Sequence, residues 1–147
     1  MKQLTTTKTN GQVPTNYMLC TKGDCPKASQ CLRHIAGAMM PADVQTWRIV
    51  SPVHLAQSQG ECAYYRSAEK VRYARGFVRM MSALSVTQAS AMKESIIATF
   101  GMARYYRMRK GTRPITPIEQ ETIYGLLEKQ GVTARPEFDA YVEDYLW

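Results

Sequence analysis

The sequence lacks the features by which membrane and exported proteins are recognised. No apolar run reaches the roughly 18 to 20 residues that a membrane-spanning helix needs, and residues 1–8 lack the apolar centre of a signal peptide. These two absences argue against a membrane partner and against a secreted protein. We therefore expect a cytoplasmic protein.

Common catalytic and nucleic-acid-binding motifs are absent as well. There is no glycine-rich phosphate loop, HExxH pair or nucleophile elbow, and no helix-turn-helix, RNA-binding aromatic signature or Cys2His2 finger. The carboxylates Glu119, Glu121 and Glu128 fall in one helical segment, where capping and solvation account for them. With no catalytic residues to nominate, we expect a non-enzymatic protein.

The composition of the 147 residues, 45% hydrophobic and 21% charged, is that of a globular chain. The first 16 residues carry few apolar side chains and are predicted to be a flexible arm, because such a segment buries too little surface to offset its ordering entropy. Residues 17–147 are predicted to form a single globular domain. Within it we expect an irregular cysteine-rich subregion at 17–65 and a helical core at 66–147.

The periodicity of apolar residues predicts a mainly α fold, a compact bundle of four or five helices with at most a small sheet. Ser85 and Gly111 are placed to begin and end one helical stretch, and Thr116–Glu119 combines a capping box with proline at the first helical position. Residues 46–50 alone have strand character. The predicted helices span residues 27–38, 67–81, 86–108, 117–130 and 136–146.

The four cysteines, Cys20, Cys25, Cys31 and Cys62, all fall in the first 62 residues. Three lie close together and one follows after 30 further residues, in a region rich in proline. Thiolates bind zinc and iron–sulfur clusters, and either would organise a segment that has little core of its own. The cysteines are therefore candidate ligands of a structural zinc ion or iron–sulfur cluster, with His34 and His54 as further donors.

Two other interpretations of the cysteines stay open. Buried free thiols acting as small apolar side chains are common, and one or two disulfides could form in an oxidising compartment. Catalysis by a cysteine nucleophile would need a base and an orienting partner, neither of which can be placed from the sequence. A redox or thiol enzyme is accordingly kept as an alternative.

Charge is distributed unevenly along the chain, whose net charge is +7. Residues 66–113 hold 11 basic and two acidic side chains, whereas residues 117–147 hold two basic and seven acidic ones. A basic face for an acidic partner, nucleic acid or an acidic protein, would use arginine on phosphates and tyrosine stacked on bases. The candidate residues are Arg72, Arg75, Arg79, Arg104, Arg109, Lys110, Arg113 and Tyr105, with Tyr106 as a second ring.

The alternative is that these cations neutralise the acidic C-terminal segment within the fold. Arg107 falls on the predicted core face of its helix, which favours pairing with Asp139 or Glu143. A third reading is a metal-free adaptor or regulator that binds proteins through its nine tyrosines and nine methionines. The leading hypothesis is a non-enzymatic binding protein with a structural cysteine-ligated metal and a basic face.

Five segments carry a resemblance to a known family: residues 25–33, 62–66, 105–111, 116–120 and 138–141. In these segments the chain resembles a family of small bacterial proteins known mainly as a domain of unknown function. The resemblance implies a compact, mostly cytoplasmic, single-domain protein. It brings no catalytic residues to carry over.

Overall fold

The computed structural model describes residues 12–147, and residues 1–11 of the predicted arm lie outside the described residues. Contacts divide the chain into two compact units. Unit 1 comprises the residues up to Lys70 together with Asp144–Trp147, and unit 2 comprises Val71–Glu143. A single domain over 17–147 stays a prediction.

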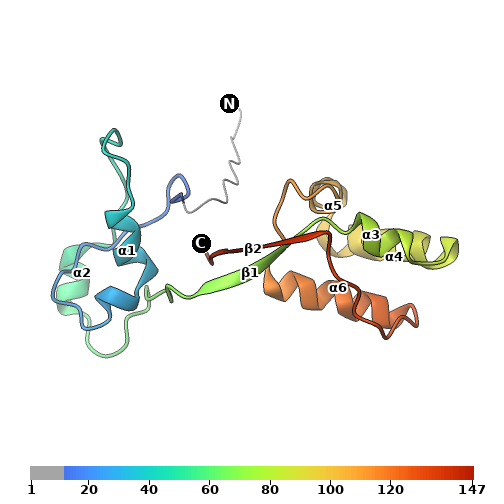
Figure 1. The fold of residues 1–147 in the computed structure, drawn as a ribbon. Coiled ribbons are helices and arrows are strands. Elements are labelled where there is room, and N and C mark those ends of the chain that lie inside the picture. Colours follow the sequence, from blue (N-terminus) through green and yellow to red (C-terminus); the bar gives the residue numbers. More distant parts are fainter. Residues whose placement is uncertain (1–11) are drawn as a thin grey trace. The chain divides into compact units, whose positions relative to one another are not determined.

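Unit 1 contains three short helical elements (Figure 1): the 3-10 turn η1 (Ala28–Gln30), α1 (Leu32–Ala38) and α2 (Pro52–Gln57). Cys31 separates η1 from α1, so the helix predicted over 27–38 is present as two pieces. Helix α2, which was not predicted, begins where the Ser51 hydroxyl accepts a hydrogen bond from the His54 amide at 3.2 Å. The strand predicted over 46–50 is reduced to a parallel bridge between Leu19 and Ile49.

Unit 2 is mainly helical. Its helices are α3 (Val78–Ser82), α4 (Val86–Phe100), α5 (Met102–Arg109) and α6 (Pro117–Lys129). Strands β1 (Lys70–Arg75) and β2 (Ala140–Tyr145) pair as a two-stranded antiparallel sheet. The prediction of a mainly α fold with a small sheet is therefore confirmed, although the part of the chain that the structure describes has six α-helices rather than four or five.

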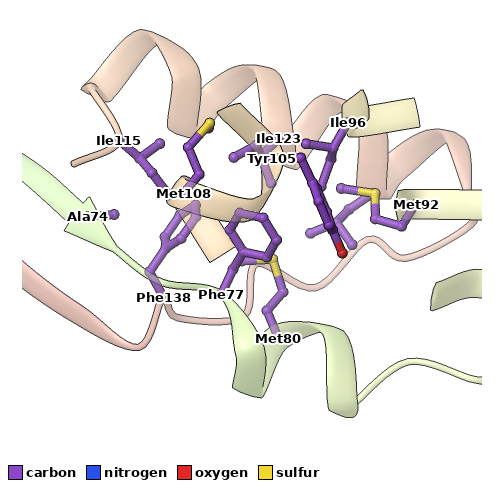
Figure 2. Close-up of a cluster of buried hydrophobic side chains, with 11 residues drawn as sticks. Ala74, Phe77, Met80, Met92, Ile96, Tyr105, Met108, Ile115, Ile123 and Phe138 are labelled. Atoms are coloured by element: carbon purple, nitrogen blue, oxygen red, sulfur yellow. The ribbon is translucent and has the colours of Figure 1, made fainter. Parts of the chain in front are cut away.

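The core of unit 2 is built from buried side chains of every one of its helices (Figure 2). Phe77, Tyr105 and Phe138 are its aromatic members, each no more than 2% exposed. The remaining core residues are Ala74, Met80, Met92, Ile96, Met108, Ile115, Ile123 and Leu127. Removal of this apolar surface from water is the main force that holds the short helices together.

The signals that begin and end the helices of unit 2 lie where the sequence places them. Ser85 with Gln88, and Thr116 with Glu119, form complete capping boxes at the starts of α4 and α6. Gly101, at φ 89°, divides the helix predicted over 86–108 into α4 and α5. Because α5 then starts on a new axis, the faces expected for a continuous helix do not extend past Gly101.

Two of the predicted helices are wrong. Residues 70–75 form strand β1 instead of part of a helix over 67–81, and residues 140–145 form strand β2 instead of a helix over 136–146. Both segments carry β-branched and aromatic residues such as Val71, Tyr73 and Tyr141, which pack well on a sheet. Their pairing across about 70 residues outweighs the helical spacing that each segment shows locally.

Gly76 and Asp139 explain why the chain turns between β1 and α3. Gly76 has φ 71°, and a Cβ there would lie 2.6 Å from Asp139 Oδ2. The Asp139 carboxylate accepts hydrogen bonds from the amides of Val78 at 2.7 Å and Arg79 at 2.9 Å, so it caps the start of α3. None of the described helices has both the length and the apolar character needed to span a membrane.

Glu119 links the start of α6 to Arg113, and this arrangement predicts an acid-sensitive contribution to stability. Its carboxylate accepts two hydrogen bonds from the Arg113 guanidinium, at 2.9 and 3.1 Å, and one from the Thr116 amide. Burial acts to raise the pKa of Glu119, but these hydrogen bonds outweigh it and hold the pKa below its ordinary value of 4.5.

A lowered folded-state pKa means that the ionised carboxylate stabilises the fold above the unfolded pKa, and that this stability is lost as the pH falls through the folded pKa. We expect Glu119→Gln to destabilise unit 2 at neutral pH, with the difference from wild type shrinking as the pH drops below about 4.5. Hydrogen exchange of unit 2 amides across pH measures this. Glu121→Gln is the control, because Glu121 lies in an exposed ion pair with Arg135; equal pH dependence in both variants would contradict the prediction.

Candidate functional site: a cysteine- and histidine-lined cavity

A cavity of about 500 Å³ in unit 1 brings together every cysteine and every histidine of the chain. Its walls include the predicted ligands Cys20, Cys25, Cys31 and Cys62, and both His34 and His54. All four thiols are free; Cys31 is buried, Cys20 and Cys25 are half-buried, and Cys62 is exposed. Sequence spacing does not fix distance, so this convergence is information that the structure adds.

The cysteines come from separate segments whose backbones are held in place by hydrogen bonds. The Cys20 amide donates to the Arg33 carbonyl at 3.0 Å. Cys31 precedes α1, forms an antiparallel bridge with Ser67, and its carbonyl accepts from the amides of the first turn. Cys25 and Cys62 each begin a turn, closed by the amides of Ala28 and Tyr65 respectively.

Arg33 is the side chain that ties these segments together. Its Nε donates to the Tyr64 carbonyl at 2.8 Å, and one terminal nitrogen donates to the Met18 carbonyl at 2.9 Å. Its guanidinium carbon lies 5.2 Å from the centre of the Tyr17 ring. Through these contacts α1 is linked to the chain before Cys20 and to the chain after Cys62. The sequence analysis missed this role, because an arginine between cysteines gives no local signal for bonds to distant carbonyls.

The two histidines differ in their surroundings. His54 Nε2 lies 3.4 Å from the Ser58 hydroxyl, and its ring meets Tyr64 edge-on. His34, on α1, has a buried Nδ1 with no hydrogen-bond partner among residues 12–147. A buried polar atom of this kind needs a partner that the described side chains do not supply. Lys22, Lys27 and Glu61 also line the cavity.

The donors do not lie close together around one point. Among the described residues, no three Cys, His, Asp or Glu side chains are near enough to one another to hold a metal ion. The cysteines and histidines therefore line the same cavity without meeting at one point. Chemically it offers four thiols, two imidazoles and several cations to a group larger than an ion.

Several cations of the predicted basic face contact other groups of unit 2. Arg79 pairs with Asp139, Nε to Oδ1 at 3.5 Å, and Arg113 pairs with Glu119. Arg75 donates to the Gly111 carbonyl at 2.9 Å, and the Arg72 guanidinium stacks over Tyr141 at 3.7 Å. Because the helix predicted over 67–81 is replaced by β1 and α3, the three arginines at 72, 75 and 79 do not form a helical stripe.

Helix α5 and its C-cap hold the remaining basic candidates. Arg104, Arg109 and Lys110 are exposed, and among the described residues none of them forms an ion pair. Tyr105 is a correction: it lies in the core, 2% exposed, and cannot stack on a base. Tyr106 is 39% exposed instead, with the Lys93 ammonium 5.9 Å from its ring centre. Arg107, expected on the core face, is exposed, and Asp139 pairs with Arg79 rather than with it.

The chain belongs to DUF6078, a family of unknown function whose model matches residues 1–147. This finding confirms the resemblance to a family known as a domain of unknown function. No curated protein and no solved structure matches the chain.

The contacts of Arg33 predict that it holds the cavity together. Arg33→Met keeps the length of the side chain and removes its donors, leaving the Met18 and Tyr64 carbonyls without their partner. We expect a loss of about 1–3 kcal/mol in the stability of unit 1. Faster reaction of the buried Cys31 thiol with an alkylating reagent, followed by mass spectrometry, measures the loosening.

Arg66→Met is the matched control for this experiment. Arg66 is exposed, and its side chain donates a hydrogen bond to the carbonyl of the neighbouring Tyr65. We expect Cys31 in this variant to react at the wild-type rate. Equal rates in Arg33→Met and Arg66→Met would show that Arg33 does not hold the cavity closed.

Proposed function

We propose that unit 1 is a metal-binding module in which Cys20, Cys25, Cys31 and Cys62 hold a zinc ion or an iron–sulfur cluster in a structural role. The observation that carries this proposal is the convergence of all four cysteines and both histidines on one cavity. Soft thiolates together with imidazole are the donors that zinc and iron–sulfur centres use.

The small core of unit 1 supports a structural role for the bound group. Its buried apolar side chains are few and mostly aliphatic: Leu19, Leu32, Ala36, Val50 and Leu55, with Cys31 beside them. A unit of this size gains little from burial alone. A centre that links four separate segments would add binding free energy directly to the free energy of folding.

A second candidate function follows from α5. We propose that its exposed side chains form a basic face for an acidic partner, nucleic acid in particular. No acidic residue occurs between Met102 and Lys110, whereas Arg104, Arg107, Arg109 and Lys110 all lie there. Arginine can bind phosphate through two nitrogens, and the half-exposed Tyr106 ring beside them suits stacking on a base. An acidic protein is the competing partner.

The metal proposal predicts that Cys25→Ser lowers both metal content and stability. The wild-type chain, purified anaerobically without a metal-binding tag, should contain zinc or iron, and the variant should contain much less. We expect the free energy of unfolding to fall by at least about 3 kcal/mol, because binding energy at a structural site is folding energy. Elemental analysis and denaturant unfolding on the same samples give both quantities.

Ser58→Ala is the control, since Ser58 lines the same cavity without being a ligand in the proposal. It should keep its metal and most of its stability. Four titratable thiols in a wild-type protein that contains neither zinc nor iron would rule out the metal-binding module and favour the metal-free adaptor.

The basic-face proposal predicts salt-dependent binding of a single-stranded oligonucleotide. Arg104→Ala combined with Arg107→Ala should weaken binding about tenfold and reduce the salt slope by about 0.7 per lost phosphate contact. Fluorescence titrations at about 50 and 200 mM salt measure both effects. Lys129→Ala combined with Arg135→Ala removes the same charge from α6 and the loop after it, and should change binding less. Equal losses in both pairs, or no binding at low salt, would contradict a nucleic-acid face on α5.

A further inference from the structure

The cavity between the cysteines is larger than a single metal ion requires. A zinc–thiolate bond is about 2.3 Å long, so four thiolates around one zinc place their sulfurs about 3.8 Å apart and enclose no free space. The cavity measures about 500 Å³, which lies within the range of about 300–1,000 Å³ found for pockets that hold whole ligands.

The spacing of the donors agrees with the size of the cavity. All four cysteines border it, yet among residues 12–147 no three donors are grouped as one ion would need. The backbones at two of the cysteines are also restrained, Cys20 by the Arg33 carbonyl and Cys31 by its bridge to Ser67. Because no three of the described donors are grouped, at least two of the four cysteines would have to move before all four sulfurs could surround one zinc.

An iron–sulfur cluster suits donors that are not grouped around one point. It contains several irons joined by its own sulfides, so its cysteine ligands bind at different corners of a body that occupies space. Cysteines spread over the wall of a cavity are the arrangement that such a body needs. We propose that the cavity of unit 1 takes an iron–sulfur cluster, with one thiolate each from Cys20, Cys25, Cys31 and Cys62. This inference rests on the proposed metal-binding function and selects the cluster over zinc.

The other side chains around the cavity suit an anionic, sulfide-rich group. Lys22, Lys27 and Arg33 line it together with one carboxylate, Glu61, so the lining carries an excess of positive charge. His34 Nδ1 is buried without a partner among the described residues. With its proton on Nδ1, His34 would donate to a sulfur of the cluster, the kind of contact that adjusts a cluster's reduction potential. His34 is thus assigned as a positioning residue, not a ligand.

Metal and sulfide analysis tests the choice of the cluster. The full-length chain is purified anaerobically without a tag, and iron, acid-labile sulfide and zinc are measured together with the visible spectrum. We expect iron and sulfide in equal amounts and a broad visible absorption that bleaches on reduction. Zinc alone, with no iron uptake after anaerobic incubation with ferrous iron and sulfide, would overturn the cluster and leave the metal-binding module standing. Uptake of neither metal would overturn both.

Paired histidine variants test the role of His34. Glutamine places its amide nitrogen near the position of Nε2, whereas asparagine places it near Nδ1. His34→Gln should therefore shift the reduction potential of the cluster while most of the iron is kept, and His34→Asn should restore the potential towards wild type.

His54→Gln is the matched control, because His54 lines the same cavity but already has Ser58 within reach. It should leave the potential unchanged. A His34→Gln potential equal to wild type, or an equal shift in His54→Gln, would show that His34 does not contact the cluster. If His34→Gln does not fold, His34→Leu takes its place, because it also removes the donor at Nδ1 and an unchanged potential would again overturn the contact.

Discussion

The candidate site depends on the hydrogen bonds that Arg33 makes to backbone carbonyls on either side of it. Its side chain binds Met18 and Tyr64, and its own carbonyl accepts from the Cys20 amide. Bonds from a charged donor are roughly twice as strong as neutral ones, and a carbonyl left without its partner is costly to bury. In a unit with few buried apolar side chains among its described residues, these bonds perform the task that a hydrophobic core performs elsewhere. They fix which segments face the cavity.

Local signals in the sequence were sufficient for two of the helix starts in unit 2. The capping boxes at Ser85 and Thr116 mark the starts of α4 and α6, because each box needs only residues within one helical turn. The strands were missed because their stability comes from pairing between residues about 70 positions apart. Gly76, within a segment that otherwise has helical spacing, was the available signal against a helix there, since its positive φ permits the turn that Asp139 then caps.

The roles of the charged residues also depend on the fold and not only on the composition. Counting residues identified a basic stretch, but it could not separate arginines that pair within the fold from those that face solvent. Arg113 belongs to the first group, Arg104 and Arg109 belong to the second, and Arg79 both pairs with Asp139 and remains exposed. Whether Tyr105 or Tyr106 is exposed depends on how α5 is rotated about its own axis, because neighbouring residues on a helix point about 100° apart. Only one of the two rings could pack against Phe77.

The candidate site could be predicted from the sequence only in part. The sequence could identify the cysteines as a set, since all four fall within the first 62 residues, but it could not say that they line a cavity without meeting at one point. That difference has a physical consequence. Protein interiors are closely packed, whereas three of the four thiols around this cavity are at least partly exposed. On the metal-binding proposal, a group bonded to all four cysteines would bury them and join the segments that Arg33 aligns. The proposal then gives one explanation for the small core of unit 1 and for described donors that are not grouped around one point: a bound group takes the place of buried side chains.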